Sequence, residues 1–82
     1  MHDKKTINFE PPTYKEMTGN NDCSIYEFEN YQLITSCFYN YVSLVKFTFE
    51  IKNILCKEEL TEENYIKVVK YAQNLFNGEK NE

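Results

Sequence analysis

The stretch Val45-Lys46-Phe47-Thr48-Phe49-Glu50-Ile51-Lys52 decides the fold, because it is compatible with two different secondary structures. Apolar and polar residues alternate strictly along it, and its β-branched and aromatic side chains favour a strand with one buried face. The same residues also belong to a longer pattern with helical spacing. The choice between the two patterns therefore decides whether the chain is all-α or α+β.

The longer pattern is a strip of polar residues that covers 28 residues in eight steps, or 3.5 residues per step. Its members are Glu29, Gln32, Ser36, Asn40, Ser43, Lys46, Glu50, Asn53 and Lys57. This period is typical of the exposed face of a helix. Upstream, Ser24-Ile25-Tyr26-Glu27 matches the capping box that begins many helices. No glycine or proline interrupts residues 20–77, which argues against the tight turns of a β-meander.

These observations predict an all-α fold with a long helix over about residues 25–56. The alternative is an α+β fold, with a small antiparallel sheet formed by residues 24–52 and a C-terminal helix packed on it. A helix over 25–56 would be about 48 Å long and too apolar for a second short helix to cover. We therefore expect a helical hairpin that pairs with a second copy in a homodimeric bundle, although a partner protein could cover the same surface.

A second helix is predicted over residues 62–77. Thr61 is a good N-cap, and Glu62 and Glu63 suit the positive end of a helix dipole. Asn77-Gly78 is a typical C-terminal stop. The apolar residues expected on one face are Tyr65, Val68, Val69, Ala72, Leu75 and Phe76.

Residues 1–23 are predicted to form an extended arm, followed by a single helical domain over 24–82. Pro11-Pro12 and the turn sequence Gly19-Asn20-Asn21-Asp22 argue against a regular helix in the arm. A short strand over 6–10 is compatible with the alternation of Ile7 and Phe9.

Composition excludes several classes of function. The 82-residue chain has a net charge of -4, and its nine basic residues are all lysines, which argues against direct nucleic-acid binding by guanidinium contacts. No signal peptide or apolar run of about 18 residues occurs, so we expect a cytoplasmic protein without a membrane partner. Frequent Asn, Lys, Tyr and Phe are typical of AT-rich genomes, including those of phages and some viruses, in which case the compartment is the host cytoplasm.

The sequence predicts no catalytic, cofactor-binding or metal-ligating residues and no cofactor. His2 is the single histidine and lies at the chain start, so a histidine-dependent triad is excluded. Cys23, Cys37 and Cys56 form no C-x-x-C pair, and we interpret them as small buried thiols. We therefore expect a non-enzymatic protein.

The leading functional prediction is an acidic protein-interaction module, such as an inhibitor or accessory factor of phage or mobile-element origin. Its acidic side chains would oppose a partner's basic surface, for instance one that binds nucleic acid. Tyrosines suit such interfaces. The predicted partner-binding residues are Glu58, Glu59, Glu62, Glu63, Tyr65, Tyr39 and Tyr41. The alternative is a dimeric DNA-binding regulator or antitoxin that contacts phosphates with lysines.

A further alternative rests on Pro11-Pro12-Thr13-Tyr14, which matches the short motif PPxY. It resembles the ligand motifs that recruit ubiquitin ligases in animal cells and in some viral budding proteins. The resemblance covers four residues and implies that Pro11, Pro12 and Tyr14 dock on the aromatic groove of a WW domain. The other interpretation is an arm in which Tyr14 packs on the core.

Overall fold

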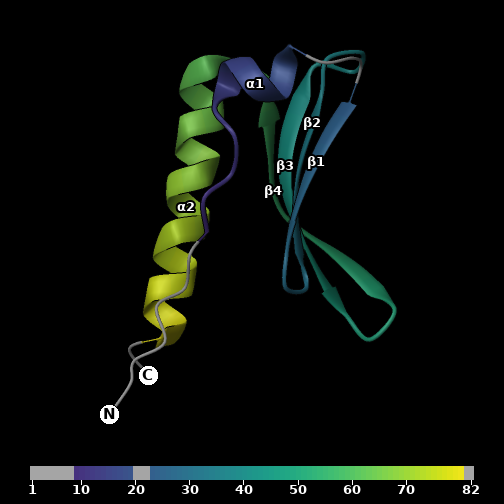
Figure 1. The fold of residues 1–82 in the computed structure, drawn as a ribbon. Helices are drawn as coiled ribbons and strands as arrows, with labels where there is room; N and C mark the ends of the chain where they lie inside the picture. The colour runs from purple at the N-terminus through teal and green to yellow at the C-terminus, as the bar shows by residue number, and fades with distance from the viewer. Residues whose placement is uncertain (1–8, 20–22, 81–82) are drawn as a thin grey trace.

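Four consecutive antiparallel strands and a long C-terminal helix make up most of the computed structural model, which describes residues 9–19 and 23–80 (Figure 1). The strands lie in the sheet in chain order, β1-β2-β3-β4. The elements are α1 (Tyr14–Thr18), β1 (Cys23–Phe28), β2 (Tyr31–Ser36), β3 (Tyr41–Thr48), β4 (Ile51–Glu59) and α2 (Glu62–Lys80). The fold is therefore α+β.

The predicted helix over 25–56 is wrong, and the alternative of an antiparallel sheet with a C-terminal helix is confirmed, although the sheet extends to Glu59 and not only to residue 52. The helical domain predicted over 24–82 is instead a sheet followed by one helix. The helical dimer bundle was expected because of the long helix, and without that helix there is no reason to expect it. Ser24 does not cap a helix, because its hydroxyl donates to the carbonyl of Met17 at 2.8 Å. Glu27 accepts a hydrogen bond from the Gln32 side chain across the β1–β2 pair, at 3.0 Å.

The sheet turns without glycine, which is why the glycine-free sequence misled the prediction. Glu29 and Phe49 have φ values of 56° and 59°, and each is the first of two residues between paired strands. Glycine usually occupies that position in a type II′ hairpin turn. Asn40, in the β2–β3 loop, has a φ of 59°. The polar residues Glu29, Asn40 and Glu50 of the supposed helical strip therefore lie in turns.

The start of α2 is confirmed. The Thr61 hydroxyl accepts a hydrogen bond from the backbone N–H of Asn64 at 3.1 Å, as an N-cap does. The helix continues to Lys80, three residues beyond the predicted end.

The main core lies between α2 and one face of the sheet. Leu33, Val42 and Leu44 are fully buried there against the apolar face predicted for α2. Tyr65, Val68, Ala72 and Phe76 are buried, and Val69 and Leu75 pack at the margin. The sheet forms because Tyr31 and Leu33 of β2 and Val42 and Leu44 of β3 give each strand an apolar side that α2 can cover.

The arm contains a short helix that the sequence analysis did not expect. The Thr13 hydroxyl accepts from the Glu16 N–H, and the Glu16 carboxylate accepts from the Thr13 N–H, at 3.2 and 2.9 Å. This capping box begins α1 at Tyr14. Phe9 is buried, with its ring 5.0 Å from that of Phe76. Of the strand expected over 6–10, residues 6–8 lie outside the described residues.

A β-bulge divides the β3–β4 hairpin into two halves. Leu44 pairs with Cys56 but Val45 pairs with Ile54, so Leu55 is an extra residue in β4. Bulges bend the strand and increase its twist. Beyond this point the hairpin bends away from α2 (Figure 1).

Candidate functional site

The predicted acidic surface does not form one patch. Glu58 and Glu59 are consecutive in β4, so their side chains lie on opposite faces of the sheet. Glu58 shares a shallow hollow with Lys67 of α2, whereas Glu59 accepts a hydrogen bond from the Asn40 side chain at 3.4 Å. Glu62 lies on the other side of α2, in a groove against the arm, and Glu63 is exposed.

Tyr65, one of the predicted partner-binding residues, belongs to the core. Its side chain is only 3% exposed, and its hydroxyl donates a hydrogen bond to the carbonyl of Pro12. Burial, with smaller contributions from Glu16 and Tyr26, raises the pKa of Tyr65 to about 12. Tyr65 therefore holds the arm against α2 and offers no surface to a partner.

The other two predicted tyrosines lie at the end of the sheet that carries the β2–β3 loop. Tyr39 is exposed, and its ring is 4.8 Å from the ring of Phe38 in an edge-to-face arrangement. Tyr41 is half-buried, and the Lys57 ammonium lies 4.6 Å from its ring centroid. Tyr39 remains available to a partner, whereas Tyr41 already has a cation–π partner within the chain.

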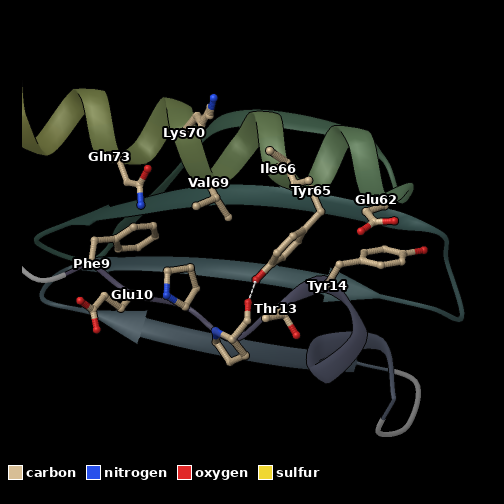
Figure 2. Close-up of a pocket in the computed structure, with 12 residues that line it drawn as sticks. Phe9, Glu10, Thr13, Tyr14, Glu62, Tyr65, Ile66, Val69, Lys70 and Gln73 are labelled. Carbon is tan, nitrogen blue, oxygen red and sulfur yellow. Dashed lines mark hydrogen bonds between the residues drawn. The ribbon is translucent and has the colours of Figure 1, made fainter.

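The PPxY residues line a groove between the arm and α2. The groove has a volume of about 540 Å³, and Figure 2 shows Phe9 on its arm side below Val69 of α2, and Tyr14 below Glu62. Pro11 and Pro12 are half-buried in it, and the Tyr14 ring lies 6.0 Å from the ring of Tyr65. Docking of this segment on a WW domain would require its contacts with α2 to break.

The described thiols differ from the expected buried set. Cys37 is exposed and Cys56 is half-buried, and both are free. Burial raises the pKa of the Cys56 thiol, assisted by the nearby Glu58 carboxylate and opposed by a hydrogen bond with the backbone of Leu44. A raised pKa lowers the thiolate fraction, which is the reactive form. The environment of Cys56 therefore suits a packing role. The side chain of Cys23 lies outside the described part of the structure.

Several exposed apolar side chains lie at the end of the β3–β4 hairpin, residues 46–54, which we call the hairpin tip. Phe49 is 96% exposed, Ile51 is 61% exposed and Ile54 is 58% exposed. Phe47 is half-buried at its base. These side chains belong to the segment that bends away from α2 beyond the bulge (Figure 1).

Phe49 is unusual in conformation as well as in exposure. A bulky residue with positive φ is rare, because its Cβ approaches the backbone, at a cost of roughly 1–2 kcal/mol. Its phenyl ring is almost wholly in contact with solvent, so packing within the chain does not compensate for this cost. Outliers of this kind concentrate where a side chain must be held in a fixed position for binding.

The hairpin tip is not among the predicted partner-binding residues. A helix over residues 25–56 would place Phe49 and Ile51 on its apolar surface, where a second helix or a second copy would bury them. The one signal in the sequence was the alternation of Phe47, Phe49 and Ile51 with polar residues. It indicated a strand but not which residues α2 would leave uncovered.

Comparison of the chain with family models, with curated proteins and with solved structures finds no match. Among the described residues, no helix is long and apolar enough to cross a membrane. Residues 9–19 and 23–80 also contain no group of three or more His, Cys, Asp or Glu side chains placed to hold a metal ion.

Proposed function

We propose that the chain is a non-enzymatic protein-binding module that inserts its hairpin tip into an apolar pocket of a partner protein. The observation that supports this most strongly is the almost fully exposed Phe49, held at a φ of 59° at the end of a projecting hairpin. Aromatic side chains are enriched in interfaces because they bury a large area with few rotatable bonds. Because the two strands of the hairpin are already paired, little conformational entropy is lost when the ring binds.

The chemistry of the tip indicates the partner's chemistry. Phe49 requires a pocket that admits a phenyl ring, and Ile51 extends the apolar contact on one face of the hairpin. Lys46 and Lys52 flank the turn in sequence, against one carboxylate, Glu50, and the Lys46 ammonium lies 5.5 Å from the centroid of the Tyr31 ring. This local excess of positive charge, on a chain whose net charge is -4, favours a pocket with an acidic rim. Occupation of such a pocket would block it, as an inhibitor or accessory factor does.

Site-specific photo-crosslinking tests this proposal. A benzophenone amino acid replaces Phe49 in one sample and Phe38, an exposed aromatic residue of the β2–β3 loop, in a matched control. Irradiation in an extract of the source cells should link position 49, but not position 38, to one protein. Excess wild-type chain should compete for this product at least about tenfold better than Phe49→Ala, as expected for loss of an interface anchor.

Two results would contradict the proposal. Equal competition by wild type and Phe49→Ala would show that the phenyl ring does not contribute to binding. Products from position 38 alone would move the binding surface to the β2–β3 loop, where Tyr39 was predicted to act. Far-UV circular dichroism of Phe49→Ala controls for folding, which should be unchanged because the side chain is exposed.

A further inference from the structure

The outer edge of β4 has no strand paired with it among the described residues. β4 is the last strand in the sheet order and pairs with β3 alone among the described strands. Its residues are exposed, apart from the half-buried Leu55 and Cys56. The opposite edge strand, β1, differs because α1 packs against it, with Ser24 bound to the carbonyl of Met17. An open edge can accept another strand by backbone hydrogen bonding.

Hydrogen bonds at the C-terminal end of β4, where the chain leads into α2, show which backbone groups of β4 face outward. The N–H of Leu60 donates to the carbonyl of Asn40 at 3.2 Å, so Leu60 faces the β3 side. Backbone groups alternate in direction along an antiparallel strand. Glu59 therefore faces away from β3, and so does Lys57. Consistent with this, the carbonyl of Glu59 accepts a hydrogen bond from the Asn64 side chain at 3.0 Å.

Beyond the bulge, hydrogen bonds of Phe47 show which residues of β4 face outward. The N–H of Phe47 donates to the Asn30 carbonyl at 2.8 Å, and the Phe47 carbonyl accepts from the Asn30 side chain at 2.9 Å. Phe47 therefore faces the β2 side, and the residue paired with it in β4, Lys52, faces outward. Ile54, two residues later, also faces outward.

Four residues of β4 face outward: Lys52, Ile54, Lys57 and Glu59. They are separated by two, three and two positions, so the order of the spacings is the same from either end of the strand. A second, antiparallel copy of β4 can therefore meet all four at once, with Lys52 opposite Glu59 and Ile54 opposite Lys57. We propose that the chain forms a symmetric dimer in which the two β4 strands pair in this register.

The side-chain faces match in the same register. Lys52, Ile54, Lys57 and Glu59 pair with the β3 residues whose side chains point away from α2, so all four side chains share the open face of the sheet. In an antiparallel pair, opposed residues must lie on one face. The two-fold axis then passes between Leu55 and Cys56, which places the two bulges at the centre of the interface, where they coincide.

Charge selects this register over a neighbouring one. Each Lys52 lies opposite a Glu59, which gives one pair of opposite charges at each end of the interface. Sliding the strands by two residues would place Lys52 opposite Lys57, and directly opposed like charges destabilise a sheet. The aliphatic stem of Lys57 would also cover Ile54, which is 58% exposed in one copy.

The product is a continuous eight-stranded sheet with both α2 helices on one face and about eight backbone hydrogen bonds between copies. Phe49 and Ile51 lie beyond Lys52, the last paired residue of each copy, so the dimer leaves these two side chains of each hairpin tip uncovered. The pairing goes beyond the proposed function, since it requires no partner protein.

Disulfide trapping tests the register. Lys52→Cys and Glu59→Cys are combined in one chain whose natural cysteines are removed by Cys23→Ser, Cys37→Ser and Cys56→Ala. Opposed, hydrogen-bonded residues have Cα atoms about 5.5 Å apart, which suits a disulfide. Within one copy the two positions are seven residues apart along a strand, or about 23 Å, and cannot link. Mild oxidation should give a covalent dimer, whereas the slipped pair Lys52→Cys with Lys57→Cys should stay monomeric.

Charge exchange provides a second test that leaves the cysteines intact. Sedimentation equilibrium of the wild type should give twice the chain mass of 9.8 kDa. Lys52→Glu should raise the dimer dissociation constant about tenfold, and adding Glu59→Lys should restore it, because like charges are removed from both ends. Lys70→Glu, an exposed charge reversal on α2, should have no effect.

Three results would overturn the β4 pairing. The first is a wild type that stays monomeric at about 0.5 mM, and the second is preferential linking of the slipped cysteine pair. The third is a dimer that Lys52→Glu does not weaken. A dimer weakened by Phe49→Ala but not by Lys52→Glu would show self-association through the hairpin tips instead. A result that contradicts the β4 dimer can therefore be distinguished from one that contradicts partner binding by the hairpin tip.

Discussion

The two halves of the β3–β4 hairpin have similar sequence patterns but opposite surroundings. In the half beneath α2, Val42 and Leu44 are fully buried, whereas beyond the bulge Phe49 and Ile51 are exposed. Along β3 and the turn after it, a polar residue separates Val42 from Leu44 in one half and Phe47 from Phe49 in the other, a spacing typical of strands. The position of α2 and the bend at the bulge together determine which half is buried. The apolar side chains of the distal half are therefore not accounted for by the chain's own core, and binding is the simplest role for them.

The largest effect should come from the buried half. Leu44→Ala should lower the free energy of unfolding by about 2–5 kcal/mol, because it leaves a cavity under α2. Ile51→Ala, an aliphatic truncation on the same hairpin, should change it by less than about 0.5 kcal/mol. Urea unfolding followed by circular dichroism measures both. Equal losses would show that the hairpin tip belongs to the core and would remove the contrast between the halves.

Tyr65→Phe tests how the arm is held over the buried half. Loss of the hydrogen bond to Pro12 should lower the free energy of unfolding by about 1 kcal/mol. The effect should depend on pH, because the pKa of Tyr65 is raised from 10.0 to about 12 in the folded chain. The neutral hydroxyl is favoured by folding, so its contribution is complete below pH 10 and is lost as the pH rises to 12.

Urea midpoints measured from pH 9 to pH 12 check this prediction. The wild type should lose stability over that range more steeply than Tyr65→Phe. Parallel curves for the two proteins would show that Tyr65 ionises as readily in the folded chain as in the unfolded one.

The smallest effect should have the opposite sign. Phe49→Gly relieves the positive φ at the hairpin tip and should raise the free energy of unfolding by about 0.5–1 kcal/mol. Phe49→Ala keeps a Cβ atom and should give no such gain. A more stable Phe49→Gly variant that no longer competes for the partner would separate folding from binding at one position. A loss of stability would mean that the phenyl ring supports the turn.

The C-terminal helix was predictable because its signals are local. Thr61 caps it, acidic residues follow at once, and its apolar face repeats with a single period. The N-terminal capping box shows the limit of such motifs. Thr13-x-x-Glu16 and Ser24-x-x-Glu27 both match the same pattern, yet only the first begins a helix. Tertiary pairing of β1 with β2 prevented the second from doing so.

The sheet was harder to predict because its turns use residues that rarely turn. Glutamate and phenylalanine occupy positions that glycine normally fills, at Glu29 and Phe49. Because no turn residue interrupted the pattern, the polar residues of the strands and turns together had an average spacing close to that of a helix. The binding surface was missed for a related reason: exposure of Phe49 depends on where the hairpin bends, which residue pairing around Leu55 determines. The buried position of Tyr65 likewise depends on the arm that returns to cover it.

The order of the strands has a kinetic consequence. Since each strand pairs with the next along the chain, every pairing of the sheet closes a short loop, and such topologies fold faster than sheets with distant pairings. The contact between Tyr65 and Pro12 spans 53 residues, so the loop that it closes costs more conformational entropy than the strand pairings do. We therefore expect the arm to dock on a sheet and helix that have already formed. Its contacts then slow unfolding and leave the folding rate almost unchanged.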